Sequence, residues 1–300
     1  MDFLFDFEKE NDCKIAFGDI SILDKMQEEY EEKSTVFSGF LKVYCDNWSD
    51  LTNIRNGGMK TIIVLSYPYH SISKVTLHYD NRTLNTTIPA GYYNYYQKNQ
   101  QFYDKLTDTL KANNIQYVDI NIPLKNLAVR LGLAEYGRNN VTYVDGYGSY
   151  HYLIAVACDK RFTETYNPKL NEPHQMIECA SCNLCINSCP MGAISENNYL
   201  IDMQKCISLY NQELNEWPNW ILKEKVRFLI ACGACQMCCP RNHGLIKQIN
   251  TYEFSVEETM AIVNDVPKDN LIWNKITNKM SDIGLSGFED YVYHNIKMLY

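Results

Sequence analysis

The stretch from Cys179 to Pro190 reads CASCNLCINSCP and decides the fold in the middle of the chain. Its pattern, Cys-x-x-Cys-x-x-Cys-x-x-x-Cys-Pro, is the run that holds [4Fe–4S] clusters in bacterial two-cluster ferredoxins. Ligands at every third residue let one loop place three thiolates on one cluster, while the fourth cysteine, carried away before the proline, reaches the other cluster. The run therefore predicts two [4Fe–4S] clusters in a ferredoxin-like segment between about residues 175 and 243.

A second run, CGACQMCCP from Cys232 to Pro240, departs from a symmetric repeat because Cys239 directly follows Cys238. The partition that fits best also uses the isolated Cys206 and leaves Cys238 spare; the alternative is that Cys238 replaces Cys206 or Cys235. The metal ligands expected for cluster one are Cys179, Cys182, Cys185 and Cys239, and those for cluster two are Cys189, Cys206, Cys232 and Cys235.

Nine of the twelve cysteines lie between Cys179 and Cys239. Two zinc sites or a set of buried thiols are the alternatives, and zinc also accepts four cysteines. The triple Cys-x-x-Cys run that ends in Cys-Pro favours iron and sulfur. The remaining cysteines, Cys13, Cys45 and Cys158, are expected to be structural thiols, because a free cysteine behaves as a small apolar residue.

Composition limits the partners and the compartment. The 300 residues carry a net charge of −8 with no basic run, which disfavours DNA as a partner. No segment approaches the roughly 18 apolar residues of a membrane span, so no membrane partner is expected. The start, MDFLFDFEKENDC, shows no export signal. We therefore expect a cytoplasmic protein, and because that compartment keeps thiols reduced, its crowded cysteines indicate metal.

Hydrophobic periodicity predicts alternating helices and strands before the cysteines. Helices are expected over 19–33, 99–113 and 123–131, and strands over 61–65, 115–120, 141–144 and 152–157. The expected fold class is α/β or α+β: a sandwich-like α/β domain over 1–165, a two-cluster ferredoxin-like domain over 166–244 and a helical C-terminal extension over 245–300. Ser255 is expected to cap the first helix of that extension.

The residues before the cysteines resemble the central signature of epoxyqueuosine reductases. That family reads roughly Leu-Ala-x-Arg-x-Gly-Leu-Gly-x-x-Gly-Lys-Asn, followed by Tyr-Gly-Ser. The isolated Cys206-Ile207-Ser208 and the closing Cys239-Pro240-Arg241-Asn242 are similar too, and the resemblance covers about residues 58–243. The stretches that carry the signature here are Leu127–Leu133, Tyr136–Asn140 and Tyr147–Ser149.

The resemblance implies a cobalamin-dependent iron–sulfur reductase, in which electrons pass through the clusters to a cobalamin that cleaves a small-molecule substrate reductively. It also implies an external low-potential electron donor such as a ferredoxin or flavodoxin, and tRNA as a partner only if the substrate is epoxyqueuosine. The cofactor-binding residues expected from the signature are Arg138, Asn139, Asn140, Gly148 and Ser149; the alternative is that they make local caps and turns.

The chain departs from the family in one way that bears on its chemistry. The family carries an acidic proton donor a few residues before Leu-Ala-x-Arg, whereas this chain has Ile122–Asn126 there, without a carboxylate. Asp119 is the nearest candidate, but it is offset, so the catalytic residues stay unknown. Two other functions remain open: an electron-transfer protein that reduces a partner protein or its corrinoid, and a non-catalytic redox sensor.

Overall fold

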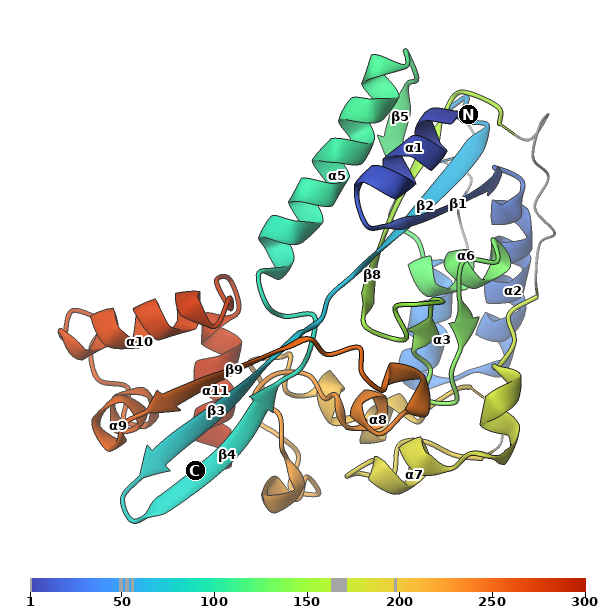
Figure 1. The fold of residues 1–300 in the computed structure, drawn as a ribbon. Coiled ribbons are helices and arrows are strands. Elements are labelled where there is room, and N and C mark those ends of the chain that lie inside the picture. Colours follow the sequence, from blue (N-terminus) through green and yellow to red (C-terminus); the bar gives the residue numbers. More distant parts are fainter. Residues whose placement is uncertain (1, 49–50, 52–53, 55–56, 163–171, 197–198) are drawn as a thin grey trace.

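A computed structural model describes residues 2–48, 51, 54, 57–162, 172–196 and 199–300. The first half of the chain is built on a four-stranded antiparallel sheet in the order β1-β2-β8-β5 (Figure 1). Its strands are β1 (Lys14–Asp19), β2 (Thr61–Pro68), β5 (Tyr117–Asp119) and β8 (His151–Cys158). Residues 62–65 of β2 are fully buried, so both faces of this sheet must be covered.

Helices cover both faces of this sheet. Successive side chains of a strand point to opposite faces, so β2 contributes to two cores. Ile62 and Val64 belong to the core with α2, α3 and α6, whereas Ile63 and Leu65 belong to the core with α1 and α5. The helices are α1 (Asp2–Glu10), α2 (Ile22–Val36), α3 (Gly39–Asn47), α5 (Tyr95–Ala112) and α6 (Leu124–Arg130). This helix–sheet–helix sandwich confirms the predicted α/β class, although the periodicity did not reveal that its strands run antiparallel.

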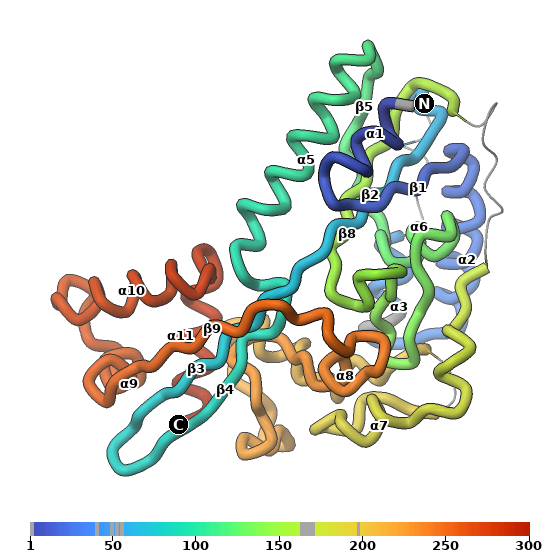
Figure 2. The backbone as a smooth tube through the Cα atoms, in the orientation of Figure 1, coloured from blue at the N-terminus to red at the C-terminus, as the bar shows by residue number. Residues whose placement is uncertain are grey.

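A second sheet joins segments far apart in the sequence. The hairpin of β3 (Ser71–Tyr79) and β4 (Arg82–Ile88) takes β9 (Gln248–Phe254) as a parallel neighbour of β3. The sequence predicted only helices after residue 244, so the strand β9 is a correction: its residues are mostly polar, QINTYEF, and show no apolar alternation. Figure 2 traces the chain from the cysteine segment, yellow to orange, back to this hairpin.

The predicted C-terminal helices are confirmed. They are α9 (Val256–Val263), α10 (Ile272–Asp282) and α11 (Glu289–Leu299). Ser255 caps α9 as expected, and its hydroxyl accepts a bond from the Glu258 amide in a reciprocal capping box. These helices share one core with Val75, Leu77 and Ile88 of the hairpin, so the hairpin and the end of the chain bury each other's apolar faces.

The cysteine segment consists of short turns of helix and lies between the sandwich and the C-terminal helices (Figure 1). Its elements are η1 (Ile177–Ser181), α7 (Leu184–Ser188), η2 (Met203–Lys205), η3 (Ile207–Leu209), η4 (Lys223–Lys225), α8 (Ala234–Met237) and η5 (Pro240–Asn242), and two short strands beside it are β6 (Glu135–Tyr136) and β7 (Thr142–Tyr143). The boundary predicted near 165 falls outside the described residues, and the domain limits stay a prediction.

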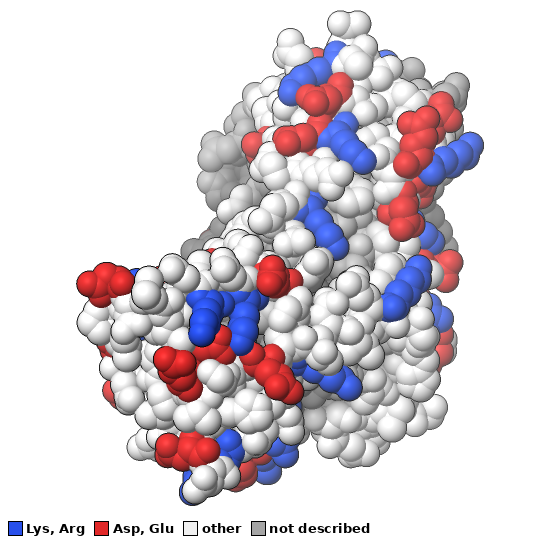
Figure 3. Space-filling view, turned by 60° about the vertical axis from the view of Figure 1, so that its left-hand side comes forward, with Lys and Arg blue, Asp and Glu red and all other residues white. Residues whose placement is uncertain are grey.

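The surface shown in Figure 3 carries Lys and Arg interspersed with Asp and Glu, and the basic residues do not gather into one area on that face. This distribution agrees with the acidic balance of the sequence, whose net charge is −8. Among the described residues, no helix has both the length and the apolar character needed to cross a membrane.

Candidate functional site

The cysteines gather into two groups in space. Cys206 and Cys189 lie close to Cys232, and burial together with these neighbouring thiols raises the pKa of Cys232 to about 12. Cys235 lies beside Cys232 and Cys206, and burial raises its pKa further. We call Cys189, Cys206, Cys232 and Cys235 the inner group. This proximity supports the predicted ligand set of the second cluster.

The outer group is Cys179, Cys182, Cys185 and Cys239. Cys239 and Cys182 lie close to Cys179, and Cys238, Cys179 and Cys182 lie close to Cys185. Four thiols on each of two groups are the donor set that two [4Fe–4S] clusters require. Within the described chain, no three His, Cys, Asp or Glu side chains converge as ligands of a single metal ion.

Cys238 lies with the outer group, near Cys239 and Cys182, and its thiol faces the carbonyl of Cys235 at 3.5 Å. The alternative that it replaces Cys206 or Cys235 is therefore not favoured by its position. We predict that Cys238→Ala keeps the full iron content of about eight atoms per chain, because both proposed ligand sets stay complete. Iron analysis after anaerobic purification checks this, and a loss of about four irons would make Cys238 a ligand.

A hollow of about 340 Å³ adjoins the inner group, and we call it the cluster hollow. All four inner cysteines line it, and in the described structure none of the outer four does. Tyrosine rings and amide side chains form much of the remaining wall: Tyr69, Tyr92, Tyr152, Asn139, Asn140 and Gln236. A cluster on the inner group would therefore face an enclosed space with both apolar and hydrogen-bonding surfaces.

Exposed apolar side chains flank the outer group, although all eight cysteines are themselves partly buried. Ile177 and Leu184, which flank the first cysteines, keep 82% and 46% of their surface exposed, and Met237 beside Cys238 keeps 46%. Exposed apolar side chains of this kind are typical of surfaces that meet a partner. The two groups thus differ in access: one faces the outside and the other faces the cluster hollow.

The predicted cofactor-binding residues Arg138, Asn139 and Asn140 bind the cysteine segment. Arg138 is buried and donates to the backbone carbonyls of Cys179 and Glu196, the latter at 2.7 Å. Asn139 donates to the carbonyl of Cys235 at 3.3 Å. These bonds hold both cysteine loops against the sandwich. Asn139 and Asn140 also line the cluster hollow, so their contact with a cofactor stays a prediction.

Gly148 and Ser149 meet the end of the cysteine segment through Asn242. The Ser149 amide donates to Asn242 Oδ1 at 2.8 Å, and Asn242 Nδ2 donates to Ser149 Oγ at 2.7 Å. Gly148 has φ +57°, and a Cβ there would lie 2.2 Å from Asn242 Oδ1. Only glycine permits this close approach. Neither Gly148 nor Ser149 lines the cluster hollow among the described residues, and their predicted role toward a cofactor is likewise untested.

A second hollow, of about 440 Å³, opens between α2, α3 and α6, and we call it the aromatic hollow. It shares Lys125, Asn140, Ile201 and Met203 with the cluster hollow, so the two adjoin. Six aromatic side chains line it: Tyr30, Phe37, Tyr44, Trp48, Tyr136 and Tyr199. No periodic pattern predicted this space, because its walls come from three separate helices and from the cysteine segment.

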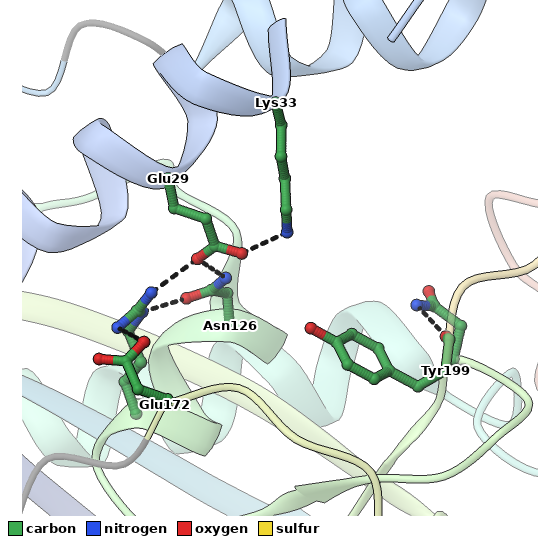
Figure 4. A network of polar contacts seen from close by, with 7 residues as sticks. Glu29, Lys33, Asn126, Glu172 and Tyr199 are labelled. Carbon is green, nitrogen blue, oxygen red and sulfur yellow. Dashed lines mark hydrogen bonds and ion pairs between the residues drawn. The ribbon is translucent and has the colours of Figure 1, made fainter. Parts of the chain in front are cut away.

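A buried ion-pair network supports one wall of the aromatic hollow (Figure 4). Arg130 donates to Glu29 at 2.7 Å, Asn126 does so at 2.9 Å, and Lys33 pairs with the same carboxylate. Burial works to raise the pKa of Glu29, but the hydrogen bonds from Lys33, Arg130 and Asn126 outweigh it and hold that pKa below its usual value. The Glu29 carboxylate is therefore ionised, and Arg130, Asn126 and Lys33 all donate to it.

Asp119, the offset candidate for the missing acid, lies elsewhere. It ends β5 on an exposed side, accepts a hydrogen bond from Tyr103, and is absent from the described linings of both hollows. From the segment 122–126, the structure instead brings Lys125 to the place where the two hollows adjoin, and Asn126 to the aromatic hollow. Sequence reasoning missed Lys125, since a single lysine on a short helix gives no functional signal.

Comparison with known proteins identifies the cysteine segment and the fold. Residues 178–242 match the family described as the 4Fe-4S double cluster binding domain. An epoxyqueuosine reductase of Gloeobacter violaceus is 27% identical over 179 residues, which cover 58% of this chain and 50% of that protein. The chain thus spans half the length of this curated relative.

Solved structures of epoxyqueuosine reductases share the fold. The enzyme of Streptococcus thermophilus superposes with a TM-score of 0.59 at 18% identity, covering 98% of this chain and 78% of that one. An epoxyqueuosine reductase crystallised with an epoxyqueuosine-modified tRNA-Tyr stem loop superposes with a TM-score of 0.57 at 22% identity, covering 81% and 65%. The likeness extends beyond the cysteine segment to the sandwich.

Proposed function

Because this chain belongs to the epoxyqueuosine reductase-like family, as a distant homologue with a 4Fe-4S double-cluster domain, we propose that it is an iron–sulfur reductase. The outer cysteines would hold one cluster and the inner cysteines a second that faces the cluster hollow, where the pair would supply low-potential electrons. The observation that carries this proposal is that the inner cysteines line the hollow while the outer ones flank exposed surface. A soluble low-potential carrier of the cytoplasm, a ferredoxin or flavodoxin, is the proposed donor.

We further propose that the cluster hollow forms part of a cobalamin site, because its volume of about 340 Å³ admits only part of so large a cofactor. The fit rests on the lining, in which amide side chains such as Asn140 and Gln236 suit the amide fringe of a corrinoid and tyrosine rings such as Tyr152 suit its flat apolar faces. When bound there, cobalamin supplies a metal centre that receives electrons singly and cleaves a substrate bond reductively. The protein's own residues position the substrate and exclude water.

The proposed substrate is a free small molecule. The relatives are named for epoxyqueuosine, and one was crystallised with a modified tRNA stem loop. Where the two hollows adjoin, this chain places Lys125 and no carboxylate of the described residues. A different reacting group is therefore expected, and tRNA is a partner only if epoxyqueuosine proves to be the substrate.

Anaerobic reconstitution tests the proposal. We expect about eight irons per chain, reduction of both clusters by a reduced ferredoxin, and stoichiometric retention of added cobalamin with a base-off cobalt(II) spectrum. Clusters without cobalamin retention would favour the alternative, an electron-transfer protein that reduces a partner protein or its corrinoid. Four irons, or zinc in the thiol sites, would contradict the reductase itself.

A further inference from the structure

Lys125 stands at the junction of the two hollows. It lies near the start of α6 and lines both of them, and its ammonium donates to the backbone carbonyl of Asn140 at 2.9 Å and to Asn140 Oδ1 at 3.0 Å. Lys125 is an exposed residue, and the Cys206 thiol lies near enough to act on its ammonium. Both partners of the ammonium are neutral oxygens.

No carboxylate of the described residues pairs with Lys125. The nearest acidic side chain among those lining the aromatic hollow is Glu29, which is committed to Arg130, Lys33 and Asn126 (Figure 4). Among the described residues, the charged side chains that line this hollow are Glu29, Lys33 and Lys125, which together carry one net positive charge. The Lys125 ammonium makes two hydrogen bonds and no ion pair, so a donor remains for an anionic ligand in the hollow.

The side chains that line the aromatic hollow indicate the chemistry of the uncharged part of the ligand. The rings of Tyr136 and Tyr199 stack at a centroid distance of 4.7 Å with 11° between their planes. This pair presents a flat ring surface in the wall of the hollow that Lys125 also lines. Tyr30, Tyr44 and Trp48 add further rings from α2 and the α3 region. Aromatic side chains prefer to contact other planar rings in offset or edge arrangements. The volume of about 440 Å³ suits a small molecule.

We propose that the aromatic hollow binds a planar aromatic substrate that carries an anionic group, and that the Lys125 ammonium receives this group. The inference rests on the proposed reductase function, since it names the substrate class for that site. It places the substrate's charge at the junction with the cluster hollow and its ring against the aromatic walls. Lys125 is then a specificity-determining residue in the segment in which the family carries an acid.

Binding of a matched pair of probes tests this without electron transfer. Equilibrium dialysis of the full chain with both clusters would compare 2-naphthoate with its neutral amide, 2-naphthamide. We expect naphthoate to bind about tenfold or more tightly than the amide, because an ion-paired hydrogen bond is stronger than a neutral one. Lys125→Met should remove that preference and leave the amide unchanged, and Lys125→Arg should keep it.

Lys111→Met serves as the control, because Lys111 is an exposed lysine of α5 that pairs with Asp108; it should not change either affinity. Equal binding of the two probes, no binding of naphthoate, or an unchanged preference in Lys125→Met would overturn the proposal. If Lys125→Met fails to keep its iron, Lys125→Gln gives the same comparison. Failure of the reductase proposal would be seen separately, in the iron content and in the reduction of the clusters, because binding of the probes involves no electron transfer.

A corrinoid phosphate is the other source of an anion near Lys125. Cobalamin carries a phosphate in its nucleotide loop, whereas cobinamide lacks it. If Lys125→Met weakens retention of cobalamin but not of cobinamide, the ammonium serves the cofactor and the substrate proposal is wrong. Equal retention of each corrinoid by the wild type and the variant, together with the lost naphthoate preference, assigns Lys125 to the substrate.

Discussion

Replacing Cys232 with alanine is expected to lower the iron content from about eight to about four atoms per chain and to abolish turnover. Cys232 lies beside Cys206 and Cys189 and lines the cluster hollow, so its loss removes one thiolate of the proposed inner cluster. The outer group lacks this residue and should keep its cluster. Iron and sulfide analysis of anaerobically purified protein, with electron paramagnetic resonance of the reduced sample, measures both effects.

The electron route makes the prediction sharper. With only the outer cluster left, a reduced ferredoxin should still reduce the protein by one electron, but no electron should reach the hollow. Cys238→Ala is the matched control, because it removes a neighbouring thiol of the same segment and is expected to keep about eight irons. Retention of all iron in Cys232→Ala would contradict the proposed assignment of the cysteines to the two clusters. Loss of all iron would show that the two clusters assemble as one unit.

Gly148→Ala is expected to destabilise the protein by about 3 kcal/mol or more and to loosen the outer cluster. The added Cβ would lie 2.2 Å from Asn242 Oδ1 and 2.9 Å from the carbonyl of Arg241. Asn242 would have to move, and it would lose its bonds to Ser149 and to the Gln236 carbonyl. Because Cys239 lies three residues before Asn242, its thiol would shift as well.

The variant Gly146→Ala separates the steric clash expected at Gly148 from the backbone penalty of alanine in this turn. Gly146 lies in the same turn with φ +76°, but a Cβ there meets no atom within 4 Å. It should therefore cost only the conformational penalty of alanine in the left-handed region, about 1 kcal/mol. Anaerobic denaturant unfolding of the cluster-loaded variants compares the two. Equal losses would mean that the contact between the turn and Asn242 contributes nothing to stability.

The spacing of the cysteines allowed the centre of this protein to be predicted, because a cluster-binding run is a local pattern with a fixed geometry. The apolar run at 61–65 likewise predicted a buried strand. The strand β2 includes that run and pairs with β1 on one side and β8 on the other. The second sheet could not be predicted in this way. Ser71 meets Gln248 across 177 residues, and the polar sequence of β9 carries no trace of its partner.

Residue type alone also left the roles of the signature residues open. An arginine and two asparagines donate equally well to a corrinoid amide or to a backbone carbonyl, and in this structure Arg138 and Asn139 use carbonyls of the cysteine loops. Lys125 gave no pattern at all, because its meaning comes from the neutral partners around its ammonium and from the two hollows that meet there. Such information exists only in three dimensions.

The pairing of β3 with β9 has a consequence during synthesis. Val75, Leu77 and Ile88 share their core with Leu229, Ile230, Phe254 of β9 and the helices that follow it. All of these come later in the chain, so the hairpin leaves the ribosome with its apolar side uncovered. At ordinary elongation rates the 177 residues between Ser71 and Gln248 take roughly 10 to 35 s to appear. The apolar side of the hairpin stays exposed to solvent through that interval, which makes the nascent chain prone to aggregate until β9 and its helices arrive.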